Sequence, residues 1–504
     1  MKTSRRQFLS TALVAPFALR ASATSPTDGS LVRTRDGMLQ GDSADGINIF
    51  RGVPFAEPPI ADLRFRPPVK IKPWQGVRNA TKFSAAAMQP GFPNVPQSED
   101  CLYLNIWAPQ RKKDLPVFVW IHGGGFTGGY AFEPTYHGTK FAKQDIICVT
   151  IPYRLGALGF LDVSPILGAS YAGSANNALR DLICALEWIK DNIAAFGGDP
   201  SRITIGGESA GAKLADILMG IPSAKLLFHQ VISESGGAER VWPASYSAEV
   251  CNGFKKDWDK ANANTSLKTA PAAAIIQCQQ TFTKHWPQHF PLRAEIDGNL
   301  IPRLPIETIA SGSTRGKRLL IGTNHDESAL FIGPHPAADP TAADLGNMSL
   351  VKFNAVFAEY KRLYPQLTPE QLRILAVTAE EYGIPSTRVA EAHLQGGGSA
   401  FVYRLDFTES SGRFKGEAYH SLDVGLAWDL PHTEVENATA EAALAHQIHA
   451  MWVAFIRGEA PHASGIPVWL PYDNKARSTM ILNDKSHVDT NPQDAERRLW
   501  DGKL

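Results

Sequence analysis

The sequence has little cysteine, no net charge, no internal repeat and no long apolar run beyond its N-terminus. Its 504 residues include five cysteines and no Cys-x-x-Cys pair, which argues against a disulfide scaffold and the common zinc or redox motifs. Fifty Lys and Arg balance fifty Asp and Glu, so no net positive field would attract nucleic acid or an anionic membrane. These absences leave an ordinary globular protein whose partner is small or neutral.

The first 23 residues have the features of an export signal. Arg5 and Arg6 form a twin arginine, residues 8–19 are apolar, and Ala21-Ser22-Ala23 is a small-x-small cleavage site. The apolar part is 12 residues long, whereas a membrane span needs about 20. We therefore expect a signal over residues 1–23 that is cleaved after twin-arginine export, and a periplasmic or secreted protein without a stable membrane anchor.

The cysteines and histidines give no sign of a metal centre. Cys148 and Cys184 lie within apolar segments and are expected to be core thiols. Cys251 and Cys278 are able to pair in an oxidising compartment, and the sequence leaves that pairing open. His446 and His449 are three residues apart but lack a third acidic or sulfur partner. We expect no metal and no cofactor.

The chain alternates between segments typical of buried strands and segments typical of helices. Apolar residues recur every three or four positions from Leu179 to Ile193, which predicts a long helix that ends before Gly197. Strand, helix, strand, helix order indicates a mostly parallel sheet, and we expect one α/β domain over residues 24–504. Short apolar runs predict strands at 115–121, 146–151, 203–205, 230–232 and 319–321, and the Ala-rich segment 244–288 is expected to form a helical cap.

Gly207-Glu208-Ser209-Ala210-Gly211 fits the pattern G-x-S-x-G directly after a predicted strand and before a predicted helix. A serine at the apex of so tight a turn is held in strained backbone, and the neighbouring chain leaves room only for glycine two residues before and after it. This context predicts a nucleophilic Ser209 above the sheet, with the N-terminus of the next helix pointing at the reacting carbonyl.

A second glycine-rich segment, His122-Gly123-Gly124-Gly125, follows the strand predicted at 115–121. It lacks the Gly-Lys-Ser/Thr ending of a phosphate-binding loop. Its unobstructed N–H groups suit an oxyanion instead. We expect Gly124, Gly125 and Ala210 to supply the three donors.

Together with these motifs, the chain resembles the type-B carboxylesterase/lipase family, which includes the cholinesterases and is represented in bacteria by para-nitrobenzyl esterases. Further motifs in the same order carry the resemblance: Phe50–Pro59, Ser98–Asn105, Tyr153–Gly156, Phe196–Pro200 and Trp452–Phe455. The resemblance implies the α/β-hydrolase fold with helical cap insertions. It also implies hydrolysis of small carboxylic esters through a Ser-His-Glu triad and an acyl-enzyme.

The resemblance also identifies the acid and the base. Glu327 follows a predicted strand, and His420 lies in a segment that matches the family's histidine motif, with Ser421 where glycine is commoner. This agrees with the Ser, acid, His order of α/β hydrolases. Asp326 is the rival acid, but adjacent side chains in extended backbone point to opposite sides. Ser235 is either a residue that supports the triad or an ordinary strand-end serine.

Two departures from the family pattern concern the segment from Met88 to Asp100. The cysteine that pairs with the one matching Cys101 is absent near Ala87, so no disulfide closes this segment. The segment also lacks the tryptophan that binds cations in cholinesterases, so we expect no preference for choline esters. A lipase with longer acyl substrates is the alternative. A purely binding protein is disfavoured because serine, acid, histidine and glycine loop are all retained.

Overall fold

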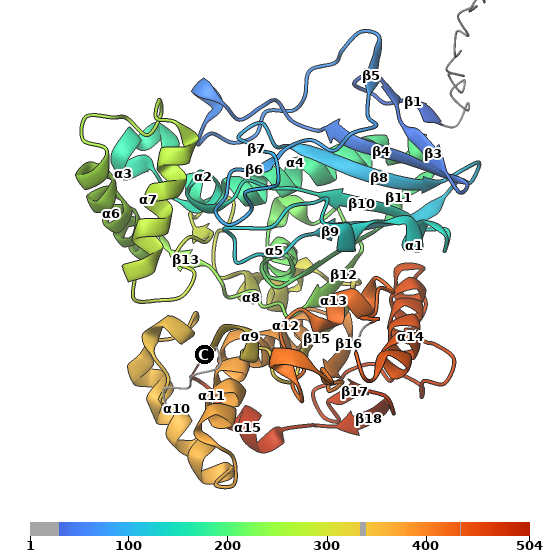
Figure 1. The fold of residues 1–504 in the computed structure, drawn as a ribbon, viewed down its shortest axis with the longest axis vertical. Helices are drawn as coiled ribbons and strands as arrows, with labels where there is room; N and C mark the ends of the chain where they lie inside the picture. Colours follow the sequence, from blue (N-terminus) through green and yellow to red (C-terminus); the bar gives the residue numbers. More distant parts are fainter. Residues whose placement is uncertain (1–29, 333–338, 434, 504) are drawn as a thin grey trace, which may run out of the picture.

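The computed structural model describes residues 30–332, 339–433 and 435–503. The export signal expected at residues 1–23 lies outside this part of the chain. None of the helices in the described ranges is long and apolar enough to cross a membrane. The described chain is built around one large twisted sheet with helices on both sides (Figure 1).

An eleven-stranded sheet forms the centre of the described chain. The strands from β17 to β10 run parallel to one another, and antiparallel strands complete both edges. This confirms the mostly parallel sheet expected from the sequence. In sheet order the strands are β18 (His487–Thr490), β17 (Ser478–Leu482), β16 (Ser399–Leu405), β15 (Arg318–Asn324), β12 (Gln230–Glu234), β11 (Gly198–Glu208), β9 (Leu115–Ile121), β10 (Ile147–Ile151), β8 (Tyr103–Pro109), β4 (Ile47–Pro54) and β3 (Asp42–Ala44).

Strand β9 explains why the central strands are apolar at every position. Val117, Val119 and Ile121 belong to the core on one face of the sheet. Phe118 and Trp120, which alternate with them, belong to the core on the other face. A parallel strand covered by helices on both sides has no polar face, so the alternation of an exposed strand disappears.

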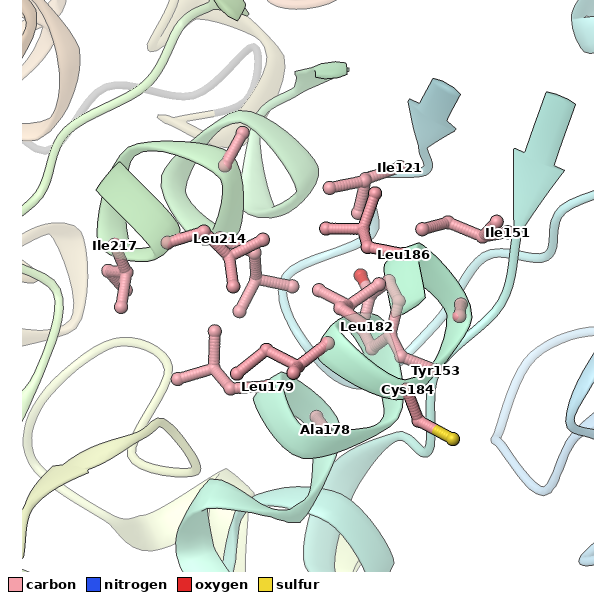
Figure 2. Packing of buried hydrophobic residues seen from close by; sticks show 14 of the residues in the cluster. Ile121, Ile151, Tyr153, Ala178, Leu179, Leu182, Cys184, Leu186, Leu214 and Ile217 are labelled. Carbon is pink, nitrogen blue, oxygen red and sulfur yellow. The ribbon is translucent and has the colours of Figure 1, made fainter. Parts of the chain in front are cut away.

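Helices α4 (Asn177–Asn192) and α5 (Ala210–Met219) fill one side of the sheet. Figure 2 shows Leu179, Leu182 and Leu186 of α4 gathered with Leu214 of α5 and the strand end at Ile121. The long helix and the helix after Ser209 are both confirmed. Every residue of α5 is buried, so this helix is fixed by packing along its whole length.

Two groups of helices lie outside the central layers (Figure 1). The first comprises α6 (Ala244–Ala261) and α7 (Ala272–His285) and confirms the helical cap expected at 244–288. The second comprises α10 (Leu350–Leu363) and α11 (Pro369–Thr378), which lie between β15 and β16 in the chain. It has a small core of its own. Helix α12 (Ile384–Gln395) follows them and packs on β15 and β16 of the central sheet. Only the first group follows from the sequence pattern.

The remaining elements are short, except for the long helix α14. The other α-helices are α1 (Thr139–Ala142), α2 (Gly156–Phe160), α3 (Ser164–Leu167), α8 (Pro305–Thr308), α9 (Ala329–Ile332), α13 (Leu422–Ala427), α14 (Ala438–Ile456) and α15 (Asp494–Leu499). The small sheets contain β1 (Leu31–Arg33), β2 (Met38–Gln40), β5 (Val77–Asn79), β6 (Ala86–Ala87), β7 (Gln97–Ser98), β13 (Trp242–Pro243) and β14 (Glu295–Ile296).

All five cysteines are buried and free. Cys251 on α6 and Cys278 on α7 therefore form no disulfide, although the two helices pack against each other. The Cys278 thiol lies 3.9 Å from the carbonyl oxygen of Phe254 instead. Burial raises the pKa of both thiols to about 12, so neither reacts readily as a thiolate.

Hydrogen bonds hold the segment from Met88 to Asp100, where no disulfide is formed. Strands β6 and β7 pair at its base. The Gln89 amide group bonds both the N–H and the carbonyl of Gly129, at 2.8 and 2.9 Å. Gln97 accepts from the Gln89 backbone N–H and donates to the carbonyl of Phe92. Polar side chains thus connect this segment to the chain that follows the glycine loop.

Candidate active site

Ser209 occupies a sharp turn between β11 and α5. Its backbone has a φ of +53° and a ψ of −121°, a strained conformation for a residue with a side chain. A Cβ on Gly207 would lie 2.6 Å from the Ile121 carbonyl oxygen, and one on Gly211 would lie 2.0 Å from it. Both glycines of the motif are therefore required by close backbone contact. The turn leaves Ser209 partly exposed at the carboxyl end of the sheet.

The glycine loop after β9 passes beside this turn. A Cβ on Gly123 would lie 3.3 Å from the Cβ of Ser209. Gly124 and Gly125 have φ values of +108° and +60°, which glycine adopts without strain. Within the described chain, the N–H groups of Gly124, Gly125 and Ala210 have no protein acceptor. These three donors remain available for a ligand.

Two buried rings support the glycine loop from below. Tyr153 donates its hydroxyl to the carbonyl of His122 at 2.9 Å. The two rings stack with centroids 4.6 Å apart. Burial lowers the pKa of His122 to about 4, so the imidazole is neutral at pH 7. His122 therefore acts as a packing residue of the loop and carries no charge towards Ser209.

Glu327 and His420 lie in direct contact behind the turn. His420 Nδ1 is 2.5 Å from Glu327 Oε2. Glu327 Oε1 accepts hydrogen bonds from the Ser235 hydroxyl at 2.5 Å and from the Asn324 backbone N–H at 2.8 Å. The carboxylate is fully buried and uses both oxygens. Of the two interpretations of Ser235, the structure favours the supporting residue.

The neighbouring Asp326 points elsewhere. Its Oδ1 lies 2.9 Å from His325 Nδ1, and its Oδ2 accepts from the backbone N–H of Ala418. Only Glu327 of the two adjacent acids meets His420. The extended backbone expected here is wrong, because residues 325–328 form a turn after β15, and the turn rather than strand alternation separates the two side chains.

The other ring nitrogen of His420 meets a second carboxylate. His420 Nε2 lies 3.0 Å from Oε1 of Glu208, and no hydrogen bond joins it to Ser209 within the described chain. Burial lowers the pKa of His420, but the carboxylates of Glu208 and Glu327 outweigh this and raise it above its ordinary value. Glu208 occupies one of the two variable positions of the G-x-S-x-G pattern, so its contact with His420 was not apparent from the motif.

Ser421 connects to the same carboxylate. Its φ is +70°, a value that favours glycine, which explains why glycine is commoner at this position in the family. The serine hydroxyl donates to Glu208 Oε1 at 2.5 Å. The strain of the left-handed backbone is therefore offset by a hydrogen bond that glycine cannot make.

A buried lysine lies one turn after Ser209. Lys213 Nζ donates to the carbonyl of Ser235 at 3.2 Å and lies 4.1 Å from the centroid of the Tyr382 ring. That ring packs 4.7 Å from His420. Burial, together with the charge of Arg240, lowers the pKa of Lys213 to about 7. A titratable cation thus contacts both the residue that holds Glu327 and the ring beside His420, and no motif indicates it.

Aromatic rings line the approach to these residues. Phe331 packs 5.2 Å from the His420 ring and is 44% exposed. Phe290 lies against Gly125, where an added Cβ would meet its ring at 2.4 Å. Both rings also pack against His289, so apolar groups of a ligand would contact a shared aromatic surface beside the glycine loop and His420. In the ranges that the structure covers, no cluster of three His, Cys, Asp or Glu residues suitable for a metal is found.

Comparison with known proteins identifies the family. Residues 28–500 match the family described as the carboxylesterase family. The chain belongs to this family. It is therefore a carboxylic ester hydrolase, and its substrates are small-molecule esters.

Individual relatives agree with this membership. The chain is 31% identical over 492 residues to the para-nitrobenzyl esterase of Bacillus subtilis (strain 168). The aligned region covers 93% of this carboxylesterase and 98% of the relative. It is 37% identical over 326 residues to the fumonisin B1 esterase of Sphingopyxis macrogoltabida, with 62% and 59% covered. The crystal structure of a Geobacillus stearothermophilus carboxylesterase superposes with a TM-score of 0.83 at 31% identity, covering 94% of this chain and all of the other. The α/β-hydrolase fold is thereby confirmed.

Proposed function

We propose that Ser209, His420 and Glu327 are the catalytic triad of this carboxylesterase and that it acts through an acyl-enzyme. The observation that carries the proposal is the 2.5 Å contact between Glu327 and His420 beside the strained turn of Ser209. A nucleophile, a base and an acid that orients the base are the three roles that this chemistry needs.

In this mechanism His420 Nε2 accepts the Ser209 proton while Oγ attacks the ester carbonyl. Gly124, Gly125 and Ala210 N–H groups stabilise the oxyanion that develops. His420 then protonates the leaving alcohol, and water releases the acid by the same steps in reverse. Glu327 keeps the proton on Nδ1 and stabilises the imidazolium. His420 exchanges its contact with Glu208 for one with Ser209 when the ester binds.

The aromatic surroundings support esters with apolar acyl or alcohol groups. Phe290 offers apolar surface at Gly125, and Phe331 offers apolar surface at His420. The segment from Met88 to Asp100 contains no tryptophan for a quaternary ammonium. We expect alkyl and aryl esters to react at least as well as choline esters of the same acid.

The experiment that tests the triad is the initial rate on para-nitrophenyl esters of increasing acyl length. We expect Ser209→Ala to lower kcat by roughly 10⁴–10⁶-fold, because the nucleophile is lost. Ser223→Ala, at an exposed position shortly after α5, serves as the control and leaves the rate unchanged. Activity that survives in Ser209→Ala would refute the assignment, and a long-chain optimum would favour a lipase.

We also propose that the protein is exported by the twin-arginine route and released by cleavage after residue 23. The twin arginine, the short apolar stretch and the Ala-Ser-Ala site support this. Mass spectrometry of the protein from a periplasmic or culture fraction should find an N-terminus at residue 24. An intact residue 1 on the active protein outside the cytoplasm would contradict cleavage.

A further inference from the structure

Ser421 lies at the start of helix α13 in a backbone conformation that does not suit a serine. Its φ is +70° and its ψ is +6°, in the left-handed region that favours glycine. A serine at the start of a helix usually accepts a hydrogen bond from a backbone N–H of the first turn. The Ser421 side chain makes no such bond. The hydroxyl therefore does not stabilise α13, although its backbone is strained.

The hydroxyl is directed instead at Glu208, which precedes Ser209. It donates to Glu208 Oε1 at 2.5 Å, and His420 Nε2 lies 3.0 Å from the same oxygen. The other oxygen, Oε2, faces the glycine loop, where a Cβ on Gly123 would lie 2.6 Å from it. Among the described residues no hydrogen-bond donor reaches Oε2. Glu208 is thus held through one oxygen, by Ser421 and His420 together.

Two partners on one oxygen determine where the charge of Glu208 points. A hydrogen bond from a hydroxyl to a carboxylate is short and strong. Glu208 and His420 are both buried, so water screens the charge between them only weakly. Without the Ser421 hydroxyl, the imidazole alone would hold Glu208, and the carboxylate would be free to turn away from Nε2.

We propose that Ser421 is a positioning residue that holds Glu208 against His420 Nε2 and so strengthens the contact that keeps the base from Ser209 before an ester binds. The proposal rests on the triad proposed above. It gives the serine a role in the resting contact of the base, which glycine at this position would not supply. An ester then has to break a stronger contact before His420 reaches Ser209.

Loss of the hydroxyl should lower the pKa of His420. Burial raises the pKa of Glu208, and the hydrogen bond from Ser421 opposes this by favouring the charged form. Without that bond, Glu208 is charged less often and less negative charge faces Nε2. Because Glu208 raises the pKa of His420, the base would then become neutral at lower pH. The acidic limb of the pH profile of kcat/KM should move in the same direction.

Other titratable groups are close enough to act on the charge of Glu208. The phenols of Tyr136, Tyr153 and Tyr382 are buried, which raises their pKa above the ordinary value. Their effects are common to wild type and variants and cancel in the comparison. The charged groups, which also stay unchanged in the variants below, are Lys213 on α5, Glu327 after β15, Asp423 on α13, Glu234 on β12 and Glu133 before Pro134.

The test compares the pH profiles of kcat/KM on para-nitrophenyl acetate for wild type, Ser421→Gly and Ser421→Ala. Both substitutions remove the hydroxyl, but only glycine relieves the left-handed backbone, so Ser421→Gly should have a higher Tm than Ser421→Ala. We expect the acidic limb to move to lower pH by about half a pH unit in both variants. At a pH below the midpoint, kcat/KM should therefore rise about two- to threefold. A purely structural role would instead make the kinetics follow the Tm.

Ser421→Gly combined with Glu208→Gln tests whether the serine acts through the carboxylate. We expect no further shift when glycine is added to Glu208→Gln, because the amide has no charge to hold. A further shift of the same size, an unmoved limb in both single variants, or a shift in only one of them would each overturn the proposal. Activity that survives in Ser209→Ala would refute the triad, whereas loss of activity there with an unmoved limb here would refute only the role of Ser421.

Discussion

The two carboxylates that flank His420 differ in how they are held. Glu327, on the Nδ1 side, is fully buried and receives hydrogen bonds from Ser235 and the Asn324 backbone as well as from the imidazole. Glu208, on the Nε2 side, receives one from Ser421 and lies next to the partly exposed Ser209. Both carboxylates are buried, but Glu327 is held by three donors, whereas Glu208 is held by the Ser421 hydroxyl and the imidazole and directly precedes Ser209.

This difference assigns the two acids distinct parts in the proposed reaction. A carboxylate that orients the base must not move, and the bonds to Glu327 prevent movement. A carboxylate that competes with the nucleophile for Nε2 must give way when substrate arrives, and Glu208 has few bonds to break. Both acids raise the pKa of His420. In the proposed mechanism only Glu327 keeps its contact once the ester binds, and it then determines which ring nitrogen carries the proton.

The largest effect is expected from the fixed acid. Glu327→Gln should lower kcat by about 10³–10⁴-fold, because the amide no longer selects the productive imidazole tautomer. Asp326→Asn is the matched control, since Asp326 bonds His325 and the Ala418 N–H rather than His420. Steady-state kinetics on para-nitrophenyl acetate measure both. Similar losses in the two variants would show that the acid has been misassigned.

A smaller effect is expected from the acid beside Ser209. Because Glu208 raises the pKa of His420, Glu208→Gln should lower that pKa. The acidic limb of the pH profile of kcat/KM should then move to lower pH. We expect a shift of about one pH unit, because one close negative charge is removed. The pH profile of the purified variant measures this. A limb that stays in place would mean that Glu208 does not face the base in the working enzyme.

Removing Lys213 should shift the pKa of His420 in the opposite direction, and this is the smallest of the three expected effects. Its positive charge lowers the pKa of His420, so Lys213→Met should raise that pKa and move the acidic limb to higher pH. The midpoint of the acidic limb should move by about half a pH unit. At a pH below that midpoint, kcat/KM should therefore fall about two- to threefold. Lys225→Met, at an exposed lysine just after α5, should leave the profile unchanged. A shift to lower pH would contradict the placement of Lys213 behind Glu327.

The parts of the site that the sequence predicts depend on local signals. The turn at Ser209 is indicated by two glycines within five residues, and β9 by a run of apolar residues. The choice of Glu327 over Asp326 came from the resemblance to the family's acid motif, since the extended backbone expected at these residues is a turn in the structure. The resemblance to the family then supplied His420, which no local pattern distinguishes among 14 histidines.

The features that the sequence did not predict depend on contacts between distant parts of the chain. Ser421 and Glu208 are 213 residues apart, and their hydrogen bond has no counterpart in either motif. Lys213 appears in the sequence as an ordinary helical lysine, and only the packing of Tyr382 and Ser235 around it makes it a buried cation. Helices α10 and α11 were missed because their apolar faces belong to a separate small core, outside the strand and helix alternation.

The five free, buried thiols also bear on how the protein can be made and handled. No disulfide has to form after synthesis, so folding is compatible with a reducing cytoplasm and needs neither an oxidase nor a disulfide isomerase. Dithiothreitol added during purification has no bond to cleave. Cytoplasmic expression of residues 24–504 is therefore a direct source of material for every measurement above except that of the exported N-terminus.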